Sequence, residues 1–102
     1  MNAQEKHNQP FPSARKIRRS CNKELYRTIK KLKIWIPPAQ VLEAETLYYK
    51  KVILNLPWIV ENASNRKVLA DWWEEQVCPE VAGLWNVEPP VLSAAFRSAF
   101  GG

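Results

Sequence analysis

The alternation of apolar and polar residues predicts a helix that begins after Ser13 and ends near Leu32 or Trp35. Apolar residues recur there every three or four positions, the period of an amphipathic helix, and polar residues fill the opposite side. Ser13 is suited to cap the first turn, and two prolines at positions 37 and 38 stop the helix, because a residue before proline avoids the α conformation. The expected buried side consists of Ile17, Cys21, Leu25, Thr28, Ile29, Leu32 and Ile36.

A second helix is expected over about residues 38–56, where Pro57 ends it. Most of its apolar residues share one broad side, but Leu47 and Leu54 fall on the opposite side. A helix that is apolar on two sides either lies at the centre of its domain or contributes to a dimer seam, and both arrangements remain open at this point. Residues 58–62 are expected to form a short connection.

Three shorter helices complete the expected fold. Asn62 or Ser64 can cap one that runs to about Val77, and prolines suited to the first turn of a helix begin the other two. These two are expected over about residues 79–85 and 89–100. The sequence therefore predicts an all-α fold, a compact bundle of four to five short helices in a single domain over residues 13–102. Residues 1–12, which are polar and contain two prolines, are expected to form a flexible N-terminal tail.

Composition agrees with this helical prediction. The hydrophobic content of 46% and the five tryptophans are too high for a disordered chain. Gly83 is the only glycine before residue 101, which disfavours a β protein built from tight hairpins. Trp35, Trp72 and Trp73 fall on the expected apolar sides of their helices, so we expect them to pack in the core rather than stack on nucleic-acid bases.

Charge is divided unevenly along the chain. The first 34 residues contain ten Lys or Arg and two Glu, a formal charge of +8, whereas the remaining residues carry −3. On the helix that follows Ser13, the cations occupy the side opposite the apolar residues. Such a concentrated positive field attracts polyanions. The expected phosphate-binding residues are Arg15, Lys16, Arg19, Lys23, Arg27, Lys30 and Lys31, with Arg97 as a candidate secondary contact.

This charge pattern leads to a functional hypothesis, to one alternative function and to an interpretation without function. The hypothesis is a small non-enzymatic, regulatory nucleic-acid-binding protein that grips the phosphate backbone with low sequence specificity. In the alternative, the protein is an interaction or assembly module whose basic helix docks on an acidic protein surface, including that of a second copy in a homodimer. A basic helix face that is merely solvated is the plainest reading of the same pattern.

The segment from Val81 to Phe96 resembles a helix-turn-helix motif. Ala82 supplies the small residue of the first helix, and Asn86 and Val87 supply the turn residue and the apolar plug. The expected recognition helix, however, offers few side chains that read bases, and Glu88 before it would repel phosphate. This departure from the motif favours a structural helix pair over a sequence-reading one.

Candidate catalytic and metal-binding groups are sparse. His7 is the only histidine and lies in the expected tail, so neither a catalytic triad nor a zinc site can be assembled, and the expectation is no enzyme, no metal and no cofactor. The carboxylates of the third helix are expected on its solvent side. Cys78 precedes Pro79 at an expected helix start, where the positive helix end favours a thiolate; the alternative is a small buried apolar residue.

The expected location follows from apolar stretches and cysteines. Residues 1–12 contain no apolar segment of the kind found in secretory signals, and residues 52–60 fall short of the ~20 apolar residues of a membrane span. Two cysteines do not make a disulfide framework, which predicts a reduced, cytoplasmic protein. The pair Gly101-Gly102 is expected to stop the last helix.

Overall fold

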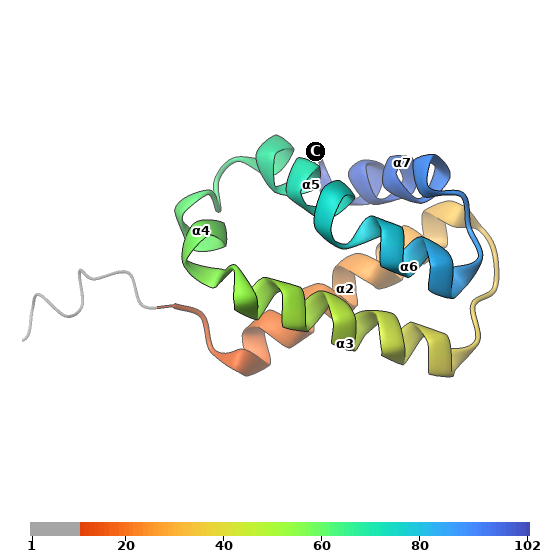
Figure 1. Cartoon of the computed structure of the whole chain (residues 1–102), viewed down its shortest axis with the longest axis horizontal. Helices are drawn as coiled ribbons and strands as arrows, with labels where there is room; N and C mark the ends of the chain where they lie inside the picture. Colours follow the sequence, from red (N-terminus) through yellow and green to blue (C-terminus); the bar gives the residue numbers. More distant parts are fainter. Residues whose placement is uncertain (1–10) are drawn as a thin grey trace, which may run out of the picture.

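The computed structural model describes residues 11–102, and within this range it contains six helices and no strand (Figure 1). Most of the expected tail, including His7, lies outside the described residues. The all-α bundle predicted from the sequence is confirmed. The helices are α2 Ala14–Leu32, α3 Pro38–Leu54, α4 Leu56–Glu61, α5 Arg66–Gln76, α6 Cys78–Trp85 and α7 Pro89–Phe100.

Helix α2 begins at the predicted cap and ends slightly earlier than its longest expected range. The Ser13 hydroxyl accepts a hydrogen bond from the Lys16 backbone N–H at 3.2 Å. Lys33 ends the helix in the left-handed conformation, with φ of 58°. Trp35 therefore lies beyond the helix, where helical periodicity no longer applies, and its exposed fraction is 77%. The prediction that Trp35 is buried is wrong, although Ile36 beside it does reach the core.

The segment after α3 differs from the sequence-based expectation. Asn55 interrupts the helical run, and residues 56–61 continue as the short helix α4 instead of forming a connection. Pro57 explains the break, because it has no N–H to continue the α3 hydrogen-bond pattern yet fits the first turn of a new helix. A proline after a helix is therefore compatible both with a loop and with a new helix. The composition of residues 56–61 does not distinguish these two outcomes.

The last helices agree closely with expectation. Asn86 adopts the left-handed conformation, with φ of 57°, and turns the chain sharply between α6 and α7. At the end of α7, Gly101 is also left-handed, with φ of 94°, and its N–H binds the Arg97 carbonyl. A residue with a Cβ would be strained there, so the final glycines act as the expected helix stop.

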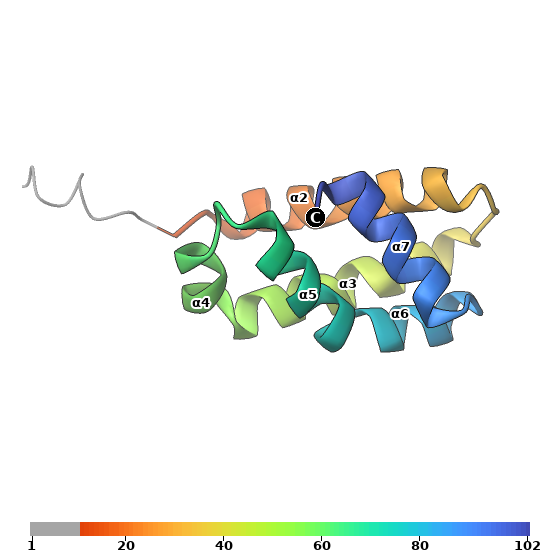
Figure 2. The same cartoon turned by 90° about the horizontal axis from the view of Figure 1, so that it is seen from above.

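The helices pack around an aromatic core. The two longest, α2 and α3, run antiparallel, and α7 crosses α2 and packs extensively against it (Figures 1 and 2). Between them, the rings of Trp73 and Phe96 stack with their centroids 3.8 Å apart, and Tyr48 meets both rings edge-on. The contacts join α3, α5 and α7, and they leave one long side of α2 facing outward.

Candidate nucleic-acid interface

Helix α2 has a buried side and a cationic side. Its buried residues, Ile17, Cys21, Leu25 and Thr28, face the neighbouring helices. The rest of its surface is turned to solvent, and every lysine and arginine of the helix is exposed. The structure therefore brings the seven sequence-predicted phosphate-binding residues together on one helix, all of them accessible: Arg15, Lys16, Arg19, Lys23, Arg27, Lys30 and Lys31.

The cations of this side are not neutralised by carboxylates of the described residues. The ion pairs found between residues 11 and 102 involve Lys51, Lys67 and Arg97, all outside α2. Exposed cations without an ion-pair partner are free to attract an external anion within the ~10 Å range that salt screening allows at 0.1 M. The α2 surface is thus available to an external anion. We call its seven predicted residues the basic face.

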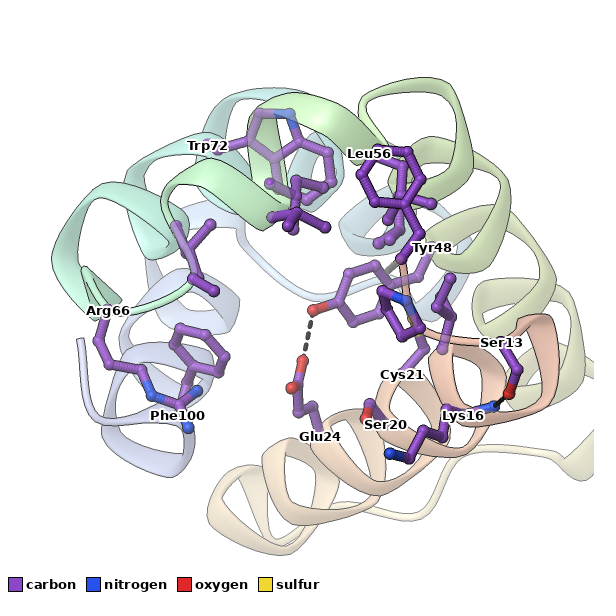
Figure 3. A pocket seen from close by; sticks show the side chains of 18 of the residues that line it. Ser13, Lys16, Ser20, Cys21, Glu24, Tyr48, Leu56, Arg66, Trp72 and Phe100 are labelled. Atoms are coloured by element: carbon purple, nitrogen blue, oxygen red, sulfur yellow. Dashed lines mark hydrogen bonds between the residues drawn. The ribbon is translucent and has the colours of Figure 1, made fainter. Parts of the chain in front are cut away.

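Glu24, the one acidic residue of α2, does not oppose this field from the outer surface. Its carboxylate is turned inward and accepts a hydrogen bond from the Tyr48 hydroxyl of α3 (Figure 3). Burial raises the pKa of Glu24, while the Tyr48 hydrogen bond and nearby arginines act in the opposite direction. The pKa of Tyr48 lies well above its ordinary value, chiefly because the hydroxyl is buried and secondly because Glu24 is adjacent.

The order of cations along α2 is unfavourable for helix stability. Arg15, Arg19, Lys23, Arg27 and Lys31 follow one another at intervals of four, so each stands one helical turn from the next like charge. Each such pair destabilises a helix by about 0.2–0.5 kcal/mol at low salt. The first turn contains cations and no acidic residue, which also opposes the helix dipole. Helix stability alone therefore does not account for this arrangement.

An exposed aromatic residue lies among the cations and was missed by the sequence analysis. Tyr26 is 61% exposed, and the Lys30 ammonium lies 5.3 Å from the centre of its ring. The sequence spacing could have predicted this position, because Tyr26 stands four residues before Lys30 and three after Lys23 on the polar side of the helix. An exposed ring among cations can stack on a base while the cations contact phosphates.

Arg97, the candidate secondary contact, is held inside the protein's own ion-pair network. Its Nη2 lies 2.6 Å from Asp71 Oδ1 and 2.7 Å from Glu74 Oε1, both on α5. These bonds lower the pKa values of both carboxyls, and they raise that of Arg97. Arg97 thus joins α7 to α5, and a phosphate would have to displace two carboxylates to reach it. We leave it out of the interface.

The segment that resembles a helix-turn-helix forms the predicted pair α6–α7, with Val87 half-buried against the core. The second helix buries Leu92, Ser93 and Phe96 and packs along α2. Its start carries exposed Glu88 and two prolines. Apart from Glu88 and the two prolines, the start of α7 offers few side chains that could reach a base, and the pair packs within the bundle.

Cys78 is buried, and the surroundings disfavour its thiolate. Its Sγ lies 3.4 Å from the Pro89 carbonyl oxygen, and burial, with a smaller contribution from Glu74, raises the pKa of Cys78 to about 11. A raised pKa is the opposite of thiol activation. Cys78 therefore corresponds to the second expectation, a small buried residue in the core. Among residues 11–102 no group of three or more metal-ligating side chains is found. No helix in this range is long and apolar enough to cross a membrane.

Comparison with known proteins found no matching family model, no similar curated sequence and no similar solved structure.

Proposed function

We propose that this protein is a small non-enzymatic nucleic-acid-binding protein that grips the phosphate backbone through the basic face of α2. The observation that carries the proposal is the accessibility of all seven cations, with no described carboxylate paired to them. Contacts of this kind bind phosphates without reading bases, which supports affinity with low sequence specificity.

The spacing of the cations, one on every turn of α2, supports this proposal over a merely solvated helix face. A solvated face gains solubility from mixed charges, whereas α2 repeats one sign at every turn and loses helix stability by doing so. Repeated cations are favourable once a polyanion is bound, because each neutralised phosphate releases counterions. The exposed Tyr26 among them adds a surface on which an unpaired base can stack.

The test is a variant with three charges removed from the face, Arg19→Gln, Lys23→Gln and Lys30→Gln. Fluorescence anisotropy with a labelled random-sequence duplex and a labelled single strand measures the affinity. We expect binding to weaken about tenfold or more at low salt for both ligands, because three phosphate contacts are lost.

The matched control removes three cations from elsewhere, Lys50→Gln, Lys51→Gln and Lys67→Gln. It changes the net charge by the same amount and leaves the basic face intact. Two of these lysines belong to exposed or partly exposed ion pairs, whose loss costs little stability. Equal affinities of the two variants would contradict the proposal, because net charge and not the α2 face would then determine binding.

A second candidate, an assembly module, is favoured by one observation on α3. Leu42 and Ile53, eleven residues apart and therefore on the same side of the helix, are 63% and 40% exposed. Leu54 at the end of α3 is 78% exposed, whereas Leu47, expected beside it, packs partly buried against the core. Such a strip of exposed apolar residues is a feature of interaction surfaces. It lies on a helix other than the basic one, so the two candidates can be tested separately.

Sedimentation equilibrium distinguishes this candidate. A self-associating protein should become monomeric when Leu42→Glu and Ile53→Glu place charges on the strip, while its affinity for nucleic acid stays unchanged. A wild-type protein that is monomeric at all accessible concentrations excludes the homodimer.

A further inference from the structure

A half-open cavity lies next to the basic face. It has a volume of about 860 Å³ and is bounded by the N-terminal half of α2, the end of α3, α4, α5 and α7. Binding sites for small organic molecules commonly have volumes of ~300–1,000 Å³, so the space is sufficient for a group of that size. Figure 3 shows the cavity with side chains from these helices directed toward its centre.

The cavity walls are largely aromatic and aliphatic. Trp72 of α5 and Phe100 of α7 stand on one side, Tyr48 of α3 lies across from them, and Leu56 of α4 lies at the top of the view (Figure 3). Flat rings and aliphatic groups around a space of this size suit a planar aromatic ligand, because both faces of the ligand can find apolar contact.

One carboxylate lies inside this apolar space. Glu24 Oε1 accepts the hydrogen bond from the Tyr48 hydroxyl, and no described residue donates a hydrogen bond to Oε2. A carboxylate can accept about four hydrogen bonds, so this group has unused capacity. A ligand that uses this capacity has to offer donors, such as the N–H groups on the Watson–Crick edge of a base.

The mouth of the cavity carries two cations. Lys16, a member of the basic face, and Arg66, at the start of α5, both line the cavity and are exposed. Neither forms an ion pair with a described carboxylate, and the Arg66 guanidinium lies 4.2 Å from the centre of the Phe100 ring. Cations at the entrance and an aromatic interior match the two parts of a nucleotide, its phosphate and its base.

We propose that the cavity receives one unstacked base of a single-stranded nucleic acid, with guanine preferred. Guanine fits best because its N1–H and its 2-amino group are adjacent donors on the Watson–Crick edge, which the two oxygens of one carboxylate can accept together. Lys16 and Arg66 hold the flanking phosphates, while Trp72 contacts one face of the base and Tyr48 lies across the cavity from it. The inference rests on the proposed function, since Lys16 belongs to both surfaces and the rest of the strand follows the basic face.

The test compares three labelled single strands of equal length and charge. One is all thymine, one has a single central guanine, and one has an abasic site at that position. We expect the guanine strand to bind wild-type protein about tenfold more tightly than the abasic strand, as the loss of one stacked and hydrogen-bonded base implies. Equal affinities for the three strands would overturn the cavity proposal and leave the proposed function intact.

Two variants assign the preference to the cavity. Glu24→Gln replaces one acceptor by a donor and should abolish the preference for guanine, measured as the ratio of the affinities for the guanine and abasic strands. Ala63→Trp adds a large ring at an exposed, cavity-lining position in the turn between α4 and α5 and should have the same effect. Glu75→Gln, the same substitution on the exposed surface of α5, is the matched control. Retention of the guanine preference in both cavity variants would contradict the proposal.

Titration with guanosine and uridine monophosphates separates the two proposals further. Trp72 lines the cavity, so its fluorescence should change with the guanine nucleotide and much less with the uridine nucleotide, and the change should be lost in Trp72→Phe. A protein that binds no strand but binds the guanine nucleotide contradicts the α2 interface and the entry of a strand into the cavity, and leaves only recognition of the free nucleotide. A protein that binds neither contradicts both.

Discussion

Glu24 shows how one residue can serve two surfaces of the molecule. Its position on the boundary of the α2 apolar side allows the carboxylate to turn inward, where it meets Tyr48 instead of pairing with the lysines of its own helix. The outer face consequently carries one sign of charge only. The same inward turn places an acceptor in the cavity beside α2.

The raised pKa of Glu24 makes stability depend on pH in a defined direction. A carboxyl whose folded-state pKa is raised contributes stability below its unfolded value, near 4.5, and that contribution is lost as pH rises through the folded pKa. Glu24→Gln keeps an oxygen acceptor for Tyr48 and removes the titration. We expect this variant to lose less stability than wild type as pH rises from 4.5 toward neutral, measured by urea unfolding at a series of pH values. The control Glu75→Gln should follow the wild-type curve; a Glu24→Gln curve parallel to wild type would be the contrary result.

Single residues were predicted well where local chemistry decides their state, and poorly where a neighbour decides it. Ser13 was identified as a cap because the cap requires only its own hydroxyl and the next turn. Trp35 was misplaced because helical periodicity was extended past the residue where α2 ends. The ion pairs of Arg97 could not be predicted, because its two carboxylate partners belong to α5, which the sequence does not place beside it.

Among the elements, α2 is stabilised by the packing of its buried side and destabilised by repulsion between the like charges of its exposed side. Four like-charge pairs one turn apart follow along the helix, from Arg15–Arg19 to Arg27–Lys31. Packing against α7 and α3 compensates for this repulsion in the folded protein. The cations proposed to bind phosphate should therefore lower the free energy of unfolding of the protein.

This trade-off gives a prediction on stability. Arg19→Gln with Lys23→Gln removes three of the four repulsive pairs, so the free energy of unfolding should rise by about 1 kcal/mol at low salt. Chemical denaturation at low and high salt measures the effect, which should shrink at high salt because screening weakens the repulsion in wild type. The control Lys67→Gln removes a favourable pair with Asp71 and should not stabilise. A double variant that unfolds more readily than wild type at low salt would contradict the trade-off.

The elements themselves were largely predictable, since prolines, caps and glycines mark most of their ends. Among residues 11–102, α4 is the helix that the sequence does not predict, because Pro57 marks the end of one helix and also fits the start of another. A proline that is followed by a loop and a proline that begins a new helix have similar sequence surroundings. They differ in whether the residues that follow find partners in the fold, as Leu56 and Ile59 do against the core.

At the scale of the whole molecule, the association of helices was beyond the sequence analysis. Amphipathic patterns indicated which side of each helix is buried, but not that α7 would cross α2 or that Trp73 and Phe96 would stack. The cavity could not be anticipated for the same reason, since its walls come from five helices. The basic face could be anticipated, because all of its residues lie on one helix.

The salt dependence of nucleic-acid binding shows directly whether the cations of the basic face contact phosphate. For wild-type protein and for the Arg19→Gln, Lys23→Gln, Lys30→Gln variant, the logarithm of the association constant is plotted against the logarithm of the salt concentration. We predict a steep slope for wild type and one lower by about 2 to 3 for the variant, because each lost phosphate contact removes about one released counterion. Identical slopes would show that these cations do not meet phosphate, and the account of α2 as a backbone-binding helix would be wrong.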